Sequence, residues 1–475
     1  MVKYDFDLIV IGSGGAGITA ALLGSGLGKK VAMLDRKRFG GECTWTGCVP
    51  SKAVIRSARI SHYIAEAARY GLTANGKISI GFDGVMKSAR GIVDSVYKGE
   101  SARHFNKMGI TAIENADISF SDPHMLKVNG KSMTSQKFMI TTGSSPLVPA
   151  IEGMDGVDIL TNETIFSLNK LPASMIILGA GPIGVEMASA LNRFGVRVTL
   201  VEMAPVILPR EDLEISELLG QSLAREGVAM LTGAAAVRVS GVKKIDLVYK
   251  LGGRERKVSA ERILVAVGRR PNTGGLALEK AGVEHDRRGI AVNRYLRTSA
   301  KNIYAAGDVV GSYQFSHVAN YQAITAASNA LLPVKRKIFY THVPWCIFTD
   351  PELARSGLTE AEARERHGGV RVYRVPYEGI DRAATDRAQN GLAKFICDRR
   401  GMILGIHILG ERAGELLHEA HAAKSLGIPL HRLNSVIHAY PTYNDIMRRA
   451  AREAYIDKLQ RSLIIRLIKL FRKAK

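Results

Sequence analysis

The residues with the clearest capacity for chemistry are two cysteines, Cys43 and Cys48, in the glycine-containing stretch 40–52. Four residues separate them, so about one helical turn would bring their β-carbons within disulfide reach. A thiolate at the start of a helix, with Lys52 nearby, would have its pKa lowered toward neutrality. The pair is therefore a candidate redox centre, and the alternative is two buried thiols that pack as small hydrophobic side chains.

The composition indicates where such a pair would work. The 475 residues contain four Cys and 48 Gly, with 46% apolar and 23% charged residues, which is typical of a globular chain of about three domains. We find no signal peptide and no run of about 18 apolar residues, so we expect a cytoplasmic protein. In a reducing compartment, a close cysteine pair is more often catalytic or metal-binding than a structural crosslink.

The net charge of +22 allows a nucleic-acid, membrane-surface or acidic-substrate partner. The basic residues are scattered and only 6% of residues are aromatic, so we expect no nucleic-acid partner. The C-terminal stretch 459–475 combines Leu and Ile with Lys and Arg, which predicts an imperfect amphipathic helix. This helix could make a peripheral membrane contact, or it could pack on the protein's own dimer.

A glycine turn near the N-terminus predicts a dinucleotide site. The apolar strand 7–11 leads into this turn, a helix follows over 18–27, and a second strand, 31–34, ends in Asp35. Glycines let backbone N–H groups and a helix N-terminus approach a pyrophosphate, and the carboxylate can accept hydrogen bonds from ribose hydroxyls. The glycines of this turn are Gly12, Gly14 and Gly17.

A second turn of the same kind follows in the middle of the chain. Strand 175–178 precedes it, helix 185–194 follows it, and strand 196–201 ends in Glu202. The glycines of this turn are Gly179, Gly181 and Gly184. Two such fingerprints predict two dinucleotides, and Glu202 favours the free 2′-hydroxyl of NADH. NADPH stays open because Arg197 is close in sequence.

Three further candidate cofactor-binding residues end strand-like runs. Gly143 and Gly268 close the similar stretches 140–146 and 263–272, which we interpret as the two crossings between domains. Asp308 follows a short strand and a glycine, which puts its carboxylate at the mouth of a parallel sheet, where ligands bind. A helix cap is the alternative role for Asp308.

The order of these patterns predicts an α/β fold with two Rossmann-like dinucleotide-binding domains and a C-terminal α+β domain. We expect the first nucleotide domain to comprise 1–150 and 273–336, and the second to comprise 151–272. The α+β domain would cover 337–457, and a basic amphipathic helix would cover 458–475.

Together, the cysteine stretch, both fingerprints, the Gly-Asp strand end and the mixed C-terminal domain resemble the flavin-dependent pyridine nucleotide-disulfide oxidoreductases. This family includes dihydrolipoamide dehydrogenase, glutathione reductase and mercuric reductase, and the resemblance covers about residues 5–455. It implies FAD at the first fingerprint and at Asp308, and NADH or NADPH at the second fingerprint. It also implies a homodimer formed through the C-terminal dimerisation domain, whose tip completes the active site of the other subunit.

The resemblance also implies a route for the electrons. Hydride passes from the nicotinamide to the flavin, and the reduced flavin opens a Cys43–Cys48 disulfide. Cys48 stays beside the flavin as a thiolate, while Cys43 attacks the sulfur or metal of the acceptor. Lys52 resembles the family lysine beside the flavin, and Glu186 resembles the glutamate that pairs with it.

The chain departs from the disulfide-reducing members near its C-terminus. They carry His immediately before the proline that corresponds to Pro441 and Glu five residues later, where this chain has Tyr440 and Asp445. A tyrosine, with a reference pKa of about 10, is a poor base near neutrality. Mercuric reductases resemble this chain in having Tyr there, although they also carry a C-terminal cysteine pair that this sequence lacks. His438 could replace the base, and a packed or solvated histidine is the alternative.

We therefore predict a FAD-dependent NAD(P)H oxidoreductase that passes electrons through the flavin and the cysteine pair to a disulfide or metal-ion acceptor, in the manner of mercuric reductases. Dihydrolipoamide dehydrogenase is an alternative favoured by Glu202. A membrane-surface NADH:quinone reductase is another, suggested by the C-terminal stretch. The acceptor is accordingly a small-molecule disulfide, a metal–thiol complex or a quinone. A non-enzymatic basic flavin-binding protein is the last alternative.

Overall fold

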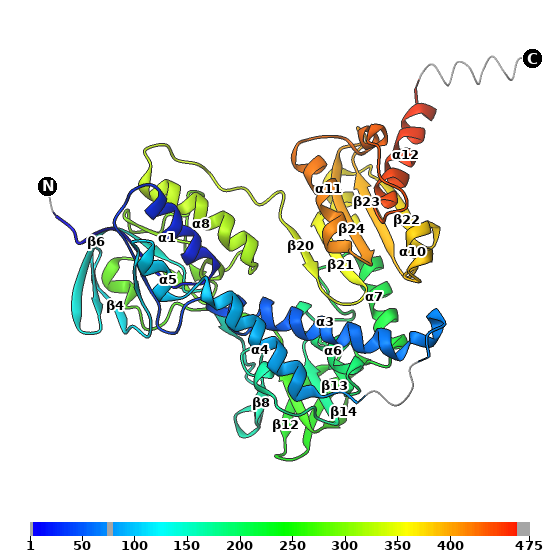
Figure 1. Ribbon diagram of the computed structural model, residues 1–475, viewed down its shortest axis with the longest axis horizontal. Coiled ribbons are helices and arrows are strands. Elements are labelled where there is room, and N and C mark those ends of the chain that lie inside the picture. Colours follow the sequence, from blue (N-terminus) through cyan, green and yellow to red (C-terminus); the bar gives the residue numbers. More distant parts are fainter. Residues whose placement is uncertain (1–2, 74–78, 463–475) are drawn as a thin grey trace, which may run out of the picture. The chain divides into compact units, whose positions relative to one another are not determined.

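The computed structural model describes residues 3–73 and 79–462. Within it the chain forms two compact units, each assembled from separate stretches of sequence (Figure 1). The first unit comprises 1–172, 240–245 and 261–339, and the second comprises 173–239, 246–260 and 340–475. The division into four segments that the sequence suggests is finer than these two units and stays a prediction.

A mostly parallel sheet forms the centre of the first unit. Its strands are β1 (Phe6–Ile11), β2 (Val31–Leu34), β3 (Thr111–Ile113), β4 (Ile118–Asp122), β5 (Met125–Val128), β6 (Lys131–Ile140) and β19 (Ile303–Ala305). β1 pairs in parallel with β2 and β6, β2 with β3, and β6 with β19. β6 also pairs with antiparallel β5, which pairs with β4. Residues 8–11 and 31–34 are at most 1% exposed, as expected for parallel strands covered on both faces.

Helices cover this sheet and carry the cysteines. They are α1 (Gly15–Gly26), α2 (Gly41–Trp45), α3 (Cys48–Ala65), α4 (Phe82–Lys98), α5 (Ala102–Lys107) and α8 (Ser316–Leu331). α1 packs against α8, and the two helices lie side by side in Figure 1. Short pairs complete the unit: β7 (Ser144–Pro146) with β16 (Arg269–Pro271), β8 (Ile159–Leu160) with β15 (Arg262–Val265), and β17 (His285–Asp286) with β18 (Gly289–Ile290).

The second unit contains the second glycine turn and the C-terminal part of the chain. Its N-terminal strands are β9 (Ser174–Leu178), β10 (Arg197–Val201), β11 (Ala229–Leu231), β12 (Ala235–Ser240), β13 (Ile245–Leu251) and β14 (Arg254–Ala260). β10 pairs in parallel with β9 and β11, while β12, β13 and β14 form a separate sheet. The helices of this part are α6 (Pro182–Arg193) and α7 (Leu213–Arg225).

An antiparallel sheet with helices organises the C-terminal part of the second unit. Its strands, in spatial order, are β20 (Pro344–Ile347), β21 (Glu352–Gly357), β24 (Ile403–Gly410), β23 (Leu392–Cys397) and β22 (Arg371–Pro376). The helices are α9 (Glu360–His367), α10 (Asp381–Thr385), α11 (Ala413–Ser425) and α12 (Asp445–Gln460). The buried core between sheet and helices includes Tyr377, Phe395, Ile406 and Met447. This part therefore has the α+β character that the sequence predicts.

α7 begins at Leu213, because Asp212 has an extended backbone and its carboxylate accepts the N–H of Glu360 at 2.9 Å. One predicted boundary differs from that of the structure. α12 runs to Gln460, so the predicted boundary at 457/458 falls inside a helix. Residues 463–475, which hold most of the predicted membrane contact, lie outside the described residues. In the described part of the chain, no helix has both the length and the apolar composition needed to cross a membrane.

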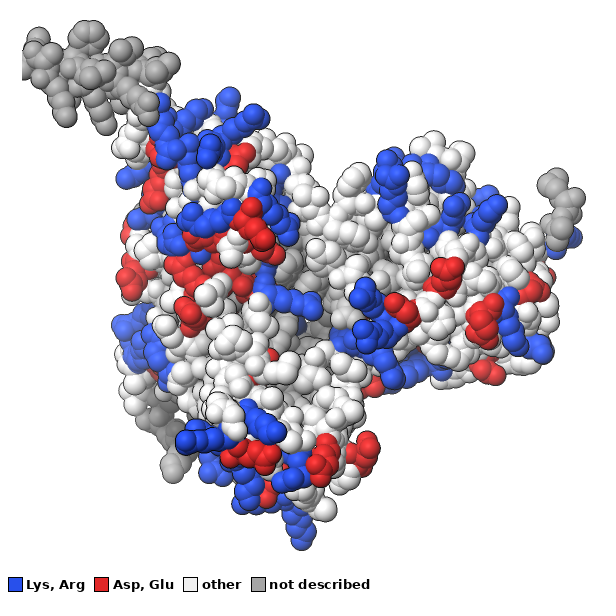
Figure 2. All heavy atoms as spheres, turned by 180° about the vertical axis from the view of Figure 1, so that it is seen from behind, with Lys and Arg blue, Asp and Glu red and all other residues white. Residues whose placement is uncertain are grey.

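The charged side chains of the face drawn in Figure 2 occur in several patches of both signs. Lys and Arg outnumber Asp and Glu by 66 to 44 in the whole sequence. On this face the acidic side chains lie between the basic ones. The sequence analysis expects no nucleic-acid partner despite the basic net charge, and this stays a prediction.

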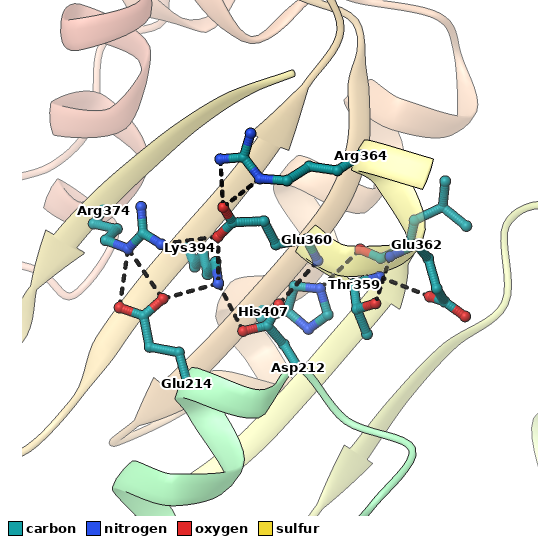
Figure 3. A network of polar contacts seen from close by, with 10 residues as sticks. Asp212, Glu214, Thr359, Glu360, Glu362, Arg364, Arg374, Lys394 and His407 are labelled. Carbon is teal, nitrogen blue, oxygen red and sulfur yellow. Dashed lines mark hydrogen bonds and ion pairs between the residues drawn. The ribbon is translucent and has the colours of Figure 1, made fainter. Parts of the chain in front are cut away.

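A buried lysine holds three segments of the second unit together (Figure 3). The ammonium group of Lys394 on β23 lies 2.7 Å from Asp212, 2.8 Å from Glu214 and 2.8 Å from Glu360. Its side chain is only 3% exposed, and a buried charge needs such partners to be tolerated. The ion pairs therefore fix the start of α7 and the start of α9 against β23.

His407 lies beside this network on β24 and is fully buried (Figure 3). Its Nε2 is 2.9 Å from the carbonyl oxygen of Leu358, and its Nδ1 has no hydrogen-bond partner among the described residues. Burial and, as a smaller cause, the nearby Arg355 guanidinium lower the pKa of His407 to about 4. The histidine is therefore neutral in the folded protein near neutral pH.

We expect the stability of the protein to fall as the pH drops from about 6.5, the ordinary histidine pKa, toward about 4. In this window the unfolded chain binds a proton at position 407 that the folded chain does not, so acid favours unfolding, by at most about 3 kcal/mol. Urea unfolding across this pH range tests the effect. His407→Gln keeps a side-chain donor without the titration and should show a shallower dependence; equal slopes for the two proteins would contradict this role.

Candidate active site

Cys43 and Cys48 form a disulfide in the structure. Cys43 lies within the short helix α2, and Cys48 is the first residue of α3, with Cα atoms 4.6 Å apart. This distance is within the range that disulfides require. The backbone between the two cysteines is helical only as far as Trp45, because Thr46 and Gly47 separate α2 from α3. Cys48 has the predicted position at a helix N-terminus.

The loop before Cys43 packs directly on the first glycine turn. Gly41 has a φ of +62°, and a β-carbon there would lie 2.5 Å from the Cα of Gly14. A contact this close is possible only between residues without side chains at this point. The structure thus brings the cysteine pair and the first fingerprint, which the sequence predicts separately, into one site.

An aromatic residue fixes α2 from its other end. Trp45 donates its indole N–H to the carbonyl oxygen of Phe39 at 2.6 Å, and the Arg38 guanidinium lies 3.2 Å from the ring centroid. The ring of Tyr97 packs on the same indole, with centroids 4.7 Å apart. Glu114 accepts the N–H of Phe39 at 2.7 Å and the hydroxyl of Tyr97 at 2.9 Å. These contacts fix the position of the helix that carries Cys43.

A group of charged residues that the sequence analysis did not select lies beside the disulfide. Arg269 donates to both carboxylate oxygens of Glu42, to the Ser144 hydroxyl at 2.8 Å, and approaches Asp308 at 3.7 Å. Asn162 also donates to Glu42, at 2.6 Å. Burial raises the pKa of both carboxyl groups, and the Arg269 charge opposes this rise. Glu42 is next to Cys43 in the sequence, and Arg269 is next to Gly268. Their position beside motif residues is the feature by which the sequence could have indicated them.

Asp308 is not a helix cap, the alternative that the sequence left open. It begins a short 3₁₀ segment, and the residue before it makes no side-chain cap hydrogen bond. Its carboxylate accepts the Ser144 hydroxyl at 2.6 Å. Asp308 therefore lies in the same polar group as Glu42, at the carboxyl end of β19.

Gly143 and Gly268 end adjacent segments of the first unit. β7 follows Gly143, β16 follows Gly268, and the two strands pair antiparallel. The N–H of Leu147 donates to the carbonyl oxygen of Gly268 at 2.9 Å, and the N–H of Asn272 donates to that of Gly143 at 2.9 Å. The two predicted crossings are therefore side by side.

The first glycine turn has the geometry of a dinucleotide cradle. A β-carbon on Gly17 would overlap the carbonyl oxygen of Gly12, so this close approach requires glycine. α1 begins after Gly14 with no side-chain cap, which leaves its N–H groups available to a pyrophosphate. Asp35 accepts the backbone N–H and the hydroxyl of Ser13 at 2.8 and 2.6 Å, which fixes the carboxylate beside the turn. These residues fit FAD.

The second turn repeats the arrangement in the second unit. A β-carbon on Gly184 would overlap the carbonyl oxygen of Gly179. α6 begins after Gly181 with Pro182 in its first turn and no side-chain cap. Glu202 accepts the N–H groups of Ala180 at 2.7 Å and Ala204 at 2.8 Å. These residues fit a nicotinamide dinucleotide.

Lys52 and Glu186 lie on helices of different units. Lys52 is the fifth residue of α3, four residues after Cys48. Glu186 is buried on α6, and its carboxylate accepts the N–H of Phe348 at 2.9 Å. Their pairing, which the family resemblance implies, stays a prediction.

Tyr440 and Asp445 take separate partners and do not bond to each other in the described chain. The Tyr440 hydroxyl donates to Asp381 at 2.9 Å, and this hydrogen bond raises the pKa of the tyrosine. Asp445 accepts Nε of Arg448 at 2.5 Å and Nε of Arg449 at 2.6 Å. Burial alone would raise the pKa of Asp445, but these two arginines lower it.

His438 has a carboxylate partner that the sequence analysis did not find. Its Nε2 lies 2.9 Å from Glu419 on α11, and Asn444 donates to the same carboxylate at 3.1 Å. The imidazole is only 6% exposed, and its Nδ1 has no hydrogen-bond partner within the described ranges. His438 is therefore packed, and it retains the ring–carboxylate geometry of an acid–base pair.

We expect Gly17→Ala to lower the amount of FAD bound per chain, because the new methyl group would displace the backbone of the glycine turn. Flavin absorbance per chain after gel filtration measures this. Gly26→Ala is the matched control, since Gly26 is on the same helix and has open space at its β-carbon position. Full flavin content in Gly17→Ala, with its helix content intact, would argue against a cofactor at this turn.

Comparison with known proteins identifies the family of the chain. Residues 6–323 match the pyridine nucleotide-disulphide oxidoreductase family, and residues 343–451 match its dimerisation domain. A mercuric reductase from Staphylococcus aureus is 35% identical over 451 residues, which covers 94% of this chain and 82% of that protein. A dihydrolipoyl dehydrogenase from Thermus scotoductus is 36% identical over 460 residues, covering 94% of this chain and 96% of that protein.

Solved structures show the same relationship. The HOCl-induced flavoprotein disulfide reductase RclA from Escherichia coli superimposes with a TM-score of 0.84 and 27% identity, over 94% of this chain and 99% of that chain. A Cu(II) complex of that protein matches with the same TM-score and 26% identity, over 93% of this chain and 98% of that chain.

These findings confirm the predicted fold class, and the dimerisation-domain match supports the predicted homodimer. They do not favour the quinone-reductase, dihydrolipoamide-dehydrogenase or non-enzymatic alternatives over the main prediction. The chain belongs to the pyridine nucleotide-disulfide oxidoreductases, and it is an FAD-dependent, NAD(P)H-using enzyme of this family with a Cys43–Cys48 disulfide.

Proposed function

We propose that the acceptor of this enzyme is a soft metal ion bound by thiolates, such as Hg(II) or Cu(II), which Cys43 meets first. The observation that carries this proposal is that Tyr440 and Asp445 form no acid–base pair. Reduction of a disulfide needs protons for the leaving thiols, whereas a metal ion needs only electrons and soft ligands. Two thiolates that reduce Hg(II) to metallic mercury re-form one disulfide, so the electrons balance without protons.

The protonation state of Tyr440 supports a metal ion as the acceptor. Its hydroxyl is engaged as a donor to Asp381, and the residue is 74% exposed. Because the carboxylate raises the pKa of the tyrosine, the phenol stays protonated near neutrality and cannot accept a proton. Asp445 is held by Arg448 and Arg449, so it does not orient a base at position 440.

The names of the relatives support the same class of acceptor. Mercuric reductases are among the similar proteins, and one solved RclA structure is a complex with Cu(II). Hg(II) is a soft ion that prefers thiolate ligands, and thiolates bind copper once it has been reduced to Cu(I). A small-molecule disulfide remains the second candidate, because dihydrolipoyl dehydrogenases are similar to this chain and His438 has Glu419 as a partner.

We further propose roles for the cofactor-site residues. FAD would be held by the first glycine turn, by Asp35 at the ribose and by Asp308, and when bound it would relay a hydride equivalent to the disulfide. Lys52 would place a positive charge beside it. The second turn would hold the nicotinamide dinucleotide. Glu202 favours NADH, because a 2′-phosphate would be repelled by its carboxylate.

We expect anaerobic NADH oxidation by the holoenzyme to be supported by Hg(II) and Cu(II) thiol complexes more than by lipoamide or a soluble quinone. In Cys43→Ser, turnover with the metals should fall by a factor on the order of 10² or more, because the metal ligand and nucleophile is lost. Cys397→Ser is the control, since this buried cysteine on β23 is not part of the disulfide. Unchanged metal turnover in Cys43→Ser would refute the proposal.

His438→Gln and Tyr440→Phe separate the two acceptor classes. If the acceptor is a metal ion, neither variant should change turnover by more than about threefold, because no proton transfer is needed. Rapid lipoamide turnover that falls by about 10²-fold or more in His438→Gln alone would instead identify a disulfide reductase with His438 as its base. Tyr440→Phe removes a hydroxyl of the same loop and controls for local disturbance.

A further inference from the structure

A serine hydroxyl lies against the disulfide from a helix that no motif includes. Oγ of Ser316 is 2.7 Å from Sγ of Cys43 and 3.7 Å from Sγ of Cys48. A disulfide sulfur carries no hydrogen, so the hydroxyl is the donor in both contacts. Ser316 is 273 residues from Cys43 in sequence, which explains why the local patterns did not indicate it.

Ser316 is also the first residue of α8, which has no side-chain cap at its N-terminus. The other helix that begins at the pair is α3, which starts with Cys48. Two helices of 16 and 18 residues therefore have their positive ends at the same two sulfurs. This arrangement favours negative charge on sulfur, and the hydroxyl adds a hydrogen bond to it.

The position of α8 is fixed by its own contacts. Its Asn320 side chain accepts the Thr19 hydroxyl of α1 at 3.3 Å. Its buried Gln322 accepts the N–H of Gly307 at 2.7 Å, next to Asp308. The hydroxyl of Ser316 therefore approaches the disulfide from a helix that is anchored to the first fingerprint and to the end of β19.

We propose that Ser316 holds Cys43 in its thiolate form after the disulfide opens, and that it does so within the subunit. Two electrons convert the disulfide into two thiolates; both electrons come from NAD(P)H through the flavin, and the proton of the hydride equivalent is released to solvent. The hydroxyl, nearer to Cys43, stabilises the charge on that sulfur, so the thiol needs no external base to become a nucleophile or metal ligand. This accounts for reactivity at Cys43 without a base at position 440.

The proposal rests on the redox role of the cysteine pair proposed above, and it holds for a metal or a disulfide acceptor. Its test reads the thiol directly rather than turnover. If the proposed acceptor is wrong, the pH dependence of Cys43 alkylation is unchanged. If Ser316 has no effect on Cys43, the turnover measured with each acceptor is unchanged. Failures of the two proposals are therefore distinguishable.

The experiment measures alkylation of Cys43 by iodoacetamide in the NADH-reduced, FAD-loaded enzyme between pH 5 and about 10, where thiols titrate. Mass spectrometry of the peptide separates Cys43 from Cys48. In Ser316→Ala we expect the apparent pKa of the Cys43 thiol, read from its alkylation rate, to rise by about one unit. At pH values below this pKa, the fraction of thiolate would then be about tenfold lower. Ser316→Thr keeps the hydroxyl and should restore the profile.

Ser328→Ala is the matched control, because Ser328 lies on the same helix, three turns from the disulfide. Its profile should equal that of the unmodified enzyme, and flavin absorbance reports that each variant still holds its cofactor. An unchanged profile in Ser316→Ala overturns the proposal. A shift that Ser316→Thr does not reverse, or that Ser328→Ala reproduces, also overturns it, because the effect would then come from disturbance of the helix.

Discussion

The site depends on the direct contact between the backbones of Gly14 and Gly41. A β-carbon on Gly41 would lie 2.5 Å from the Cα of Gly14, so no side chain can stand between the two loops. One loop begins the helix of the first fingerprint, and the other begins the helix that carries Cys43. This steric constraint sets how close a dinucleotide on the turn and a disulfide on the helix can be, which is the condition for electron transfer between them.

Buried charged groups and aromatic packing also hold the helix that carries Cys43 in place. Glu42 is tied to Arg269, which also approaches Asp308, and Trp45 is held by the Arg38 guanidinium. Burial raises the pKa of Glu42, but the Arg269 charge opposes that shift, so the ion pair offsets part of the cost of placing the carboxylate there. These contacts hold the short helix that carries Cys43 at Glu42 and at Trp45, as a preorganised site requires.

The sequence predicted the features whose signals are local. Strands, glycine turns and the cysteine spacing follow from residues within a few positions of one another, and the structure has them at those places. The residues that contact the site residues could not be predicted from the sequence, because they come from distant segments of the chain. Arg269 lies 227 residues from Glu42, and Ser316 lies 273 residues from Cys43. The family resemblance put Tyr440 and Asp445 at the positions of an acid–base pair, but in the structure the Tyr440 hydroxyl donates to Asp381 of α10.

The proton balance of the reaction bears on residues of both units. An acceptor disulfide that becomes two thiols takes up two protons with its two electrons, so its enzyme needs a group that exchanges protons near neutrality. A thiolate-bound metal ion takes up electrons only, so its enzyme needs sulfur that stays ionised. Tyr440, with its pKa raised by Asp381, does not supply the first requirement. The hydroxyl of Ser316 and the positive ends of α3 and α8 supply the second. The Ser316 hydroxyl and the two helix N-termini therefore do for Cys43 what a base would otherwise do. A site that reduces metal ions needs these groups, because it needs ionised sulfur.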